Sequence, residues 1–251
     1  MKATSIPAHE QSFFLTGIDA QGKKFKLKKT IVDIPGTTQK ITFVDCTRDN
    51  GDESFFYKEA VTKERIVLHY TAGYLKGDIS RLTTQGDHVS VPYVIARSGQ
   101  ILRLWNDAYW SYHLGAGVPG GNTEMSKRSI GIEISNIGYL APAGQNLVTA
   151  YGNNDVYCAL ADANYYTALP TPYRGKKYYA SFTAAQYASV KLLLTYLCAQ
   201  HPTIPFQFLE AAKRFDVLAN PAAFKGIVSH VNFRTDKWDI GPGFEWGKIT
   251  S

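Results

Sequence analysis

The sequence predicts an α/β fold in which a mixed central β-sheet is flanked by helices. Residues 65–70 and 227–229 form β-branched apolar runs, typical of buried strands, and His69 and His230 lie at their ends. Residues 183–197 have the clearest helical pattern in the chain. This helix is expected to pack on the sheet, and both histidines are expected to lie at one end of the sheet.

The chain of 251 residues is 45% hydrophobic, so it can bury a sizeable core. Its longest apolar run, residues 192–199, is shorter than the roughly 20 residues that a membrane-spanning helix needs, so no span is predicted. Residues 1–7 lack the pattern of a signal peptide. The three cysteines contain no C-x-x-C pair, which argues against a disulfide framework or a cysteine zinc knuckle.

A net charge of +6 favours a polyanionic partner, which could be nucleic acid, an anionic membrane surface or a cell-wall polymer. The densest basic cluster, residues 23–29, alternates lysines with apolar residues at period two. That spacing favours an amphipathic strand with a solvated lysine face. Charge alone does not choose among these partners.

Residues 1–60 are predicted to form a β-rich N-terminal extension of unknown role. Short apolar runs at 13–15, 25–27 and 41–44 are separated by Gly, Pro and Asp-Asn turns. The extension is either a small β appendage or a set of strands that lengthen the main sheet.

Residues 61–251 form the predicted main domain. After the strand that carries His69, residues 76–82 are expected to open a short helix, and residues 91–105 a hairpin. A further strand at 129–136 holds a glutamate, Glu133, inside an apolar run. A buried carboxylate is costly unless it is paired, near a metal or functional, so Glu133 is a candidate site residue. Residues 138–181 lose clear periodicity and are predicted to be an insertion that acts as a lid or wall.

His69, His230 and Asp239 supply the donor set of a catalytic zinc site. Asp239 lies in a Gly/Pro-containing turn shortly after His230. Two imidazoles and a carboxylate give zinc three protein ligands and leave one position open for water. A single histidine at a strand end is usually structural, so the prediction depends on the combination.

The motifs resemble those of the zinc-dependent N-acetylmuramoyl-L-alanine amidases, a family that includes phage endolysins, bacterial cell-wall amidases and peptidoglycan-recognition proteins. The similarity is carried by His-Tyr-Thr-Ala at 69–72, Ser-Ile-Gly-Ile-Glu at 129–133, Val-Ser-His at 228–230 and Lys-Trp-Asp-Ile-Gly-Pro-Gly at 237–243. It covers roughly residues 65–247, apart from 138–181.

The resemblance implies a fold like that of these amidases and one Zn²⁺ per chain, held by His69, His230 and Asp239. It implies that Glu133 is the catalytic carboxylate and Lys237 a catalytic lysine. The expected reaction is hydrolysis of the amide between N-acetylmuramic acid and the L-alanine of the stem peptide. The residues expected to contact substrate are His113, Tyr70, Trp110 and Arg128.

Several alternatives remain open. Some relatives bind peptidoglycan without cleaving it, and a metallopeptidase that cuts within the stem peptide would use the same metal chemistry. A nucleic-acid binder would leave Glu133 unexplained, so peptidoglycan or a muropeptide is the expected partner. The tyrosines of the insertion are either a sugar-stacking wall or simple packing. We expect a monomer, a phage-type endolysin or related lytic enzyme, made in the cytoplasm and acting on the wall after release.

Overall fold

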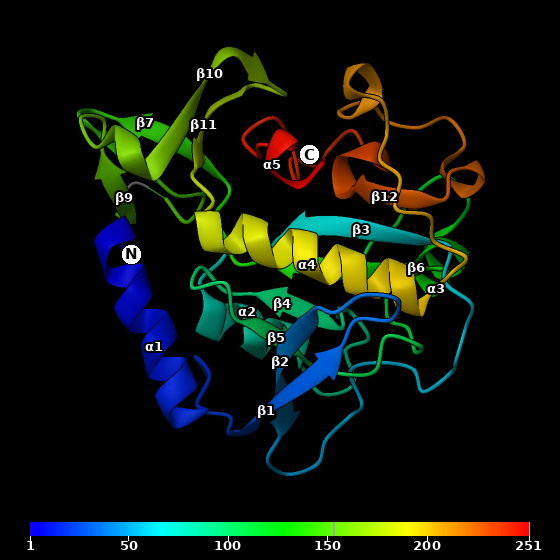
Figure 1. Cartoon of the computed structure of the whole chain (residues 1–251). Coiled ribbons are helices and arrows are strands. Elements are labelled where there is room, and N and C mark those ends of the chain that lie inside the picture. Colours follow the sequence, from blue (N-terminus) through cyan, green and yellow to red (C-terminus); the bar gives the residue numbers. More distant parts are fainter. Residues whose placement is uncertain (153, 251) are drawn as a thin grey trace.

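The computed structural model describes residues 1–152 and 154–250 as a mixed seven-stranded sheet with helices on both faces and a smaller second sheet beside it (Figure 1). The strand order of the main sheet is β1-β2-β5-β4-β6-β3-β12. Its strands are β1 (Phe25–Asp33), β2 (Lys40–Arg48), β3 (Arg65–Tyr70), β4 (Tyr93–Ile95), β5 (Ile101–Arg103), β6 (Ser129–Ile134) and β12 (Gly226–Ser229). The predicted α/β class with a mixed central sheet is confirmed.

The strands that carry the candidate site are parallel. β3 pairs with β6 on one side and with β12 on the other, and β4 runs parallel to β6. The carboxyl ends of parallel strands meet at one edge of a sheet, so the residues that end β3, β6 and β12 are brought together there. The expected β4–β5 hairpin is confirmed as an antiparallel pair.

Helices cover both faces of the main sheet. In Figure 1, α4 crosses the sheet in the centre of the view, while α1 lies to one side. No helix among the described residues is long and apolar enough to cross a membrane. The α-helices are α1 (Ile6–Thr16), α2 (Leu75–Leu82), α3 (Asn122–Lys127), α4 (Ala184–Gln200) and α5 (Gly247–Thr250), and the 3₁₀ turns are η1 (Ala3–Ser5), η2 (Ala163–Tyr165), η3 (Ala211–Lys213), η4 (Pro221–Ala223) and η5 (His230–Asn232).

Helix α4 confirms the strongest helical pattern of the sequence. Thr183 caps it with a capping box, in which the threonine side chain accepts from the Gln186 amide and the glutamine side chain accepts from the Thr183 amide. The helix ends at Gln200, before Pro202. Its buried side chains, among them Val190 and Leu193, pack in the same core cluster as the isoleucines of β3 and β6.

Alternation along β3 assigns its side chains to two faces. Ile66, Leu68 and Tyr70 lie in the core cluster that contains α4, whereas Val67 lies in a different cluster on the opposite face. Successive side chains of a strand point to opposite faces, so His69 shares the face of Val67 and points away from α4.

The N-terminal extension is not purely β-rich, and the strand predicted at residues 13–15 is wrong. These residues belong to α1, whose buried positions Ile6, Glu10 and Phe13 have helical spacing. The helix has a proline in its first turn and ends at Gly17, which has φ of 63°. An apolar run of three residues is compatible with either a strand or a helix, so the local sequence did not distinguish them.

The predicted strands at 25–27 and 41–44 are confirmed as parts of β1 and β2. They extend the main sheet, because β2 pairs in parallel with β5. The N-terminal segment is therefore joined to the main sheet through the pairing of β2 with β5. Among the described residues it forms no separate β appendage.

The insertion forms a five-stranded antiparallel sheet in the order β10-β11-β7-β8-β9. Its strands are β7 (Tyr139–Ala143), β8 (Asn146–Val148), β9 (Val156–Ala159), β10 (Tyr166–Tyr173) and β11 (Lys176–Ala180). Several are only three to five residues long, which explains why no alternation was visible in the sequence. The sheet packs on Ile6 of α1 through Leu140, Leu147 and Tyr157.

Candidate metal centre and active site

Three neighbouring strands position the site at one edge of the main sheet. His69 of β3 and Glu133 of β6 are paired in register, so their side chains project from the same face. β12 ends at Ser229, one residue before His230. The chain then turns through η5 and returns, and the Val231 amide donates to the Asp239 carbonyl (3.0 Å).

The donor atoms of His69, His230 and Asp239 form a small triangle. The two histidine Nδ1 atoms are 3.1 Å apart, and Asp239 Oδ2 lies 3.0 Å from His69 Nδ1 and 2.9 Å from His230 Nδ1. Within the described residues, this is the group of histidine, cysteine and acidic side chains that could hold a metal ion. Both histidines are almost fully buried.

This triangle fits zinc. Ligand atoms about 2.0–2.2 Å from a tetrahedral zinc ion are separated by roughly 3.3–3.6 Å, a few tenths of an ångström more than the observed spacing. Burial lowers the pKa of His69 to about 4, although Asp239 opposes this shift, so the imidazole is in the neutral form that binds metals. Burial disfavours ionised Asp239, but His230 and His69 outweigh it and hold the pKa of this carboxyl well below its ordinary value.

Hydrogen bonds behind the triangle orient both imidazoles. His230 Nε2 donates to the Leu114 carbonyl (2.9 Å), because a carbonyl can only accept, and its Nδ1 lone pair is left for a metal. His69 Nε2 lies 3.0 Å from His113 Nδ1. If His69 binds metal through Nδ1, its Nε2 proton is donated to His113. Such partners fix tautomer and ring orientation in metal sites.

Glu133 lies directly across from His69 in the register of β3 and β6. It is partly exposed, and its Oε2 atom is buried without a hydrogen-bond partner among the described residues. Burial, followed by the charges of Asp239 and Asp78, raises the pKa of Glu133 well above its ordinary value, while Lys237 acts in the opposite direction. Its unpaired oxygen is available to a water molecule or a substrate.

Lys237 lies in the loop between His230 and Asp239 and is half-buried. Its positive charge acts to lower the pKa of His69 and that of Glu133. Two imidazoles and two carboxylates therefore gather at one edge of the sheet, and Lys237 lies in the loop that joins His230 to Asp239. This set can hold a metal, move a proton and stabilise a developing negative charge.

Comparison with known proteins places the sequence in a family. The sequence model of the N-acetylmuramoyl-L-alanine amidase family matches residues 60–243, which is most of the chain. The chain belongs to this family. Among curated protein sequences, none matches the chain significantly.

Two solved structures resemble the amidase over much of its length. The N-acetylmuramyl-L-alanine amidase AmiD from E. coli, in complex with anhydro-N-acetylmuramic acid-L-Ala-D-γ-Glu-L-Lys, is 19% identical with a TM-score of 0.48. AMPDH3 from Pseudomonas aeruginosa is 16% identical with a TM-score of 0.47. In both alignments 87% of this chain and 64% of the other chain are covered, so this chain spans less than two thirds of either protein.

The residues expected to contact substrate fall into different places in the amidase. His113 contacts the His69 ring directly through its Nδ1 atom. This position suits a residue that orients the His69 imidazole for metal binding, rather than one that contacts substrate. Tyr70 is 8% exposed, points to the face opposite His69 and packs on Gly138 at the start of the insertion. It belongs to the core because of strand alternation.

Trp110 and Arg128 are also poor candidates for substrate contact. Trp110 is 4% exposed, stacks on Tyr57 and donates to Glu59 (2.8 Å). Arg128 precedes the first residue of β6, at the end of the strand opposite Glu133, and it pairs with Glu64. Five residues of extended strand separate Arg128 from Glu133, about 16 Å. Neither position favours substrate contact, and the expectation for both residues stays a prediction.

The tyrosines of the insertion do not form one exposed wall. Tyr157 is buried in the core of the second sheet, and the Tyr173 hydroxyl donates to the Phe215 carbonyl (3.0 Å). Tyr165 and Tyr166 are half-buried, and Tyr166 donates to Leu160. Tyr151 is 66% exposed. Packing therefore accounts for most of these rings, and Tyr151 is the one left open to solvent among the five.

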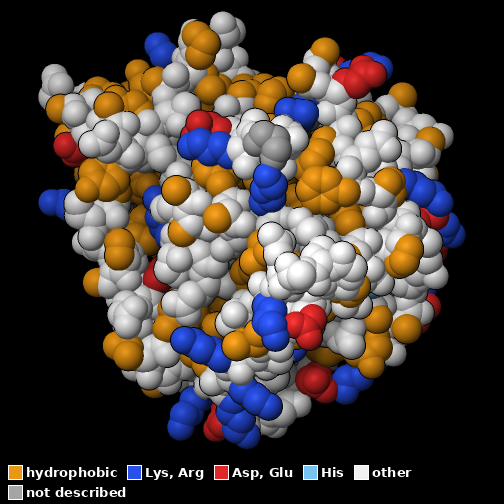
Figure 2. All heavy atoms as spheres, viewed as in Figure 1, with side chains coloured by type: hydrophobic (Ala, Val, Ile, Leu, Met, Phe, Trp, Pro, Cys, Tyr) orange, Lys and Arg blue, Asp and Glu red, His pale blue; other side chains and the backbone are white. Residues whose placement is uncertain are grey.

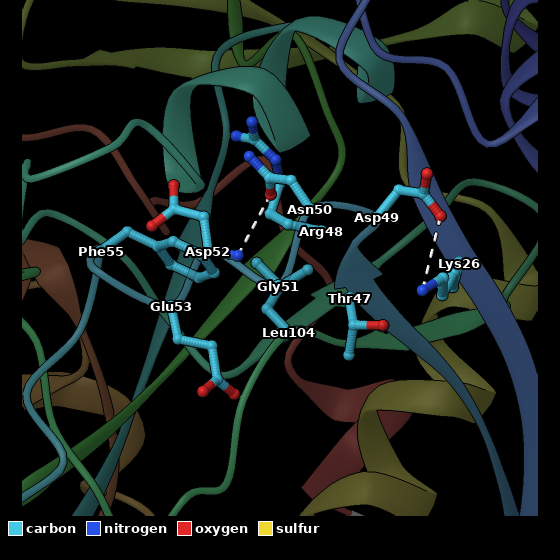
Figure 3. A pocket seen from close by; sticks show the side chains of 10 residues that line it. All are labelled: Lys26, Thr47, Arg48, Asp49, Asn50, Gly51, Asp52, Glu53, Phe55 and Leu104. Carbon is cyan, nitrogen blue, oxygen red and sulfur yellow. Dashed lines mark hydrogen bonds and ion pairs between the residues drawn. The ribbon is translucent and has the colours of Figure 1, made fainter.

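A hollow of about 490 Å³ lies away from the site, between β1, β2 and the loop at residues 49–53. Figure 3 shows Lys26 and Asp49 pointing toward each other, with 3.6 Å between nitrogen and oxygen. None of the nine predicted site residues lines it. This hollow is therefore separate from the candidate metal centre.

Proposed function

We propose that this amidase is zinc-dependent and cleaves the amide between the lactyl group of N-acetylmuramic acid and the L-alanine of the stem peptide in peptidoglycan. The observation that carries the zinc assignment is the triangle of donor atoms of His69, His230 and Asp239, with edges of 2.9–3.1 Å. The family supports the choice of bond.

Each residue has a defined task in the proposed reaction. Zinc held by these three side chains supplies Lewis acidity toward a water molecule and the substrate carbonyl. Glu133 accepts the proton of the attacking water and delivers it to the departing L-alanine amine. The Lys237 ammonium stabilises negative charge that develops on the carbonyl oxygen. His113 and the Leu114 carbonyl hold the two imidazoles in orientation.

The convergence of the donor set argues against a recognition module that only binds peptidoglycan. Such a module has no need of an unpaired buried carboxylate oxygen beside three metal-binding side chains, which is what Glu133 provides. A metallopeptidase that cuts within the stem peptide would use the same residues. The masses of the products separate these two reactions.

We further propose a role as a phage-type endolysin or related lytic enzyme, made in the cytoplasm and acting on the wall after release. The net charge of +6 supports attraction to an anionic wall. Lys24, Lys26, Lys28 and Lys29 are exposed on or beside β1. In Figure 2, Lys and Arg side chains gather at the lower end of the visible face, where Figure 1 places β1.

The test is mass spectrometry of soluble products after zinc-loaded protein is incubated with isolated peptidoglycan, beside a chelator-treated sample. Stem peptides that begin at L-alanine and are released only with metal are the expected result. Fragments cut within the stem would replace the proposal with the peptidase. Unchanged wall, with measurable zinc and wall binding, would replace it with the recognition module.

A further inference from the structure

The hairpin that joins β10 to β11 has an unusual residue at its tip. Arg174 and Gly175 both have positive φ, 47° and 76°. Turns with positive φ at both central residues favour Asn-Gly or Gly-Gly, because a bulky side chain is strained in the left-handed region. An arginine held there indicates that its side chain makes contacts that offset this strain.

Those contacts lie in the loop that carries the metal-binding residues. The Arg174 guanidinium donates to the carbonyls of Val231 (3.2 Å), Arg234 (2.7 Å) and Lys237. All three carbonyls lie between His230 and Asp239 in the sequence. One side chain therefore ties together most of the segment that separates two of the three candidate ligands.

The rest of the hairpin tip contacts the same loop. The Trp238 indole donates to the Arg174 carbonyl (3.1 Å), and the Lys176 ammonium lies 5.7 Å from the Trp238 ring centre. A Cβ on Gly241 would come within 3.0 Å of the Tyr173 ring. In Figure 1, the β10–β11 hairpin accordingly lies beside the C-terminal segment. The insertion and the ligand loop are thus packed together at the tip of the hairpin.

We propose that Arg174 is a positioning residue that holds the His230–Asp239 loop in its metal-binding conformation. The inference rests on the proposed zinc site and deepens it. A planar guanidinium presents several donors in fixed directions, so it can set the relative positions of three carbonyls. Without it, the loop must be ordered when the metal binds, and the conformational entropy of that ordering weakens affinity. In this proposal the insertion stabilises the metal site through Arg174.

The test compares Arg174→Gly with Lys177→Ala. Both variants remove one positive charge from the same hairpin, but Lys177 is exposed and lies over Tyr178, away from the ligand loop. Glycine suits the positive φ of position 174, so the turn itself is preserved. Zinc affinity is measured by competition with a fluorescent chelator, and coordination geometry by the visible absorption of the Co²⁺-loaded protein. Circular dichroism of the metal-free proteins reports the fold.

Removal of a side chain that orients metal ligands typically lowers metal affinity by about 10- to 100-fold. We expect a loss of that size and an altered Co²⁺ spectrum for Arg174→Gly, with Lys177→Ala unchanged. Equal zinc affinity and identical Co²⁺ spectra in the two variants would overturn the proposal. If Arg174→Gly does not fold, Arg174→Lys is used in its place. Lysine keeps the positive charge but lacks the planar guanidinium with its several donors. Zinc affinity of Arg174→Lys equal to that of Lys177→Ala would likewise overturn the proposal. A parent protein that binds no zinc would instead refute the proposed function.

Discussion

His69 and Glu133 are direct cross-strand neighbours on the parallel strands β3 and β6. The backbone register alone therefore fixes a candidate zinc ligand and the candidate base on one face of the sheet. Sites built on regular elements hold their geometry more closely than sites built on loops. The remaining groups, His230, Lys237 and Asp239, come from the end of β12 and a loop, and they depend on contacts from elsewhere.

The first prediction concerns Glu133. Glu133→Gln keeps the shape of the side chain but removes its ability to accept a proton, so we expect the amidase rate to fall by at least about 100-fold. Zinc binding should be nearly unchanged, because Glu133 is not part of the donor triangle. Product release from peptidoglycan and zinc content are measured on the same preparation. Full activity would remove Glu133 from the mechanism, and loss of zinc would make it a ligand.

The second prediction concerns His113, which contacts His69 Nε2 at 3.0 Å. His113→Ala removes the acceptor that orients this imidazole, and we expect zinc affinity to fall by about 10-fold or more. His88→Ala is the control, because His88 stacks on Tyr57 and not on a ligand. Zinc competition with a chelator measures both variants. Equal affinities would show that His113 does not orient His69.

Much of this fold could be predicted because its strongest sequence signals are local. The β-branched runs of β3 and β12 and the capped pattern of α4 can each be recognised within a short stretch of sequence. The candidate ligands follow strand ends or turns, and family motifs mark them. Helix α1 was not visible in this way, because its apolar residues form no clear stripe and one of its buried residues is the charged Glu10.

The substrate-contact residues could not be predicted in the same way, because their roles depend on which face of the sheet they occupy. Tyr70 is adjacent to His69 in the sequence, yet strand alternation sends it into the core. Arg174 lies about 60 residues from the carbonyls it contacts, and no motif marks it. The fold creates such long-range contacts, and only the three-dimensional arrangement reveals them.

The third prediction tests the cap of α4. The Thr183 hydroxyl accepts from the Gln186 amide and donates to the Arg97 carbonyl (2.7 Å). We expect Thr183→Ala to lower the free energy of unfolding by about 1–2 kcal/mol. Thr195→Ala in the same helix is the control. Thr195 is half-buried, and its hydroxyl donates to the Lys191 carbonyl within the helix. Because alanine favours the helical conformation, we expect the free energy of unfolding to change by no more than about 0.5 kcal/mol. Urea denaturation measures both, and equal effects would argue against the cap.

The fourth prediction concerns the pH dependence of stability. Asp78 of α2 is 6% exposed, and burial raises its pKa from 3.8 to about 7, although hydrogen bonds from Thr71 and Ser135 oppose the shift. Between about pH 4 and pH 7 the native state keeps a proton that the unfolded chain has lost, so stability falls as the pH rises through this window, by up to about 1.4 kcal/mol per pH unit. Above pH 7 this contribution is constant and unfavourable.

Asp78→Asn removes that titration, so the variant's gain in stability over the parent should be largest at pH 8 and clearly smaller at pH 5. Glu10 is also buried with a raised pKa, but it is present in both proteins and cancels in the comparison. Urea denaturation at the two pH values measures the effect, and Asp33→Asn, at a side chain 80% exposed, serves as control. If Asp78→Asn and Asp33→Asn change stability by the same amount at both pH values, then Asp78 is not protonated in the native state near neutral pH.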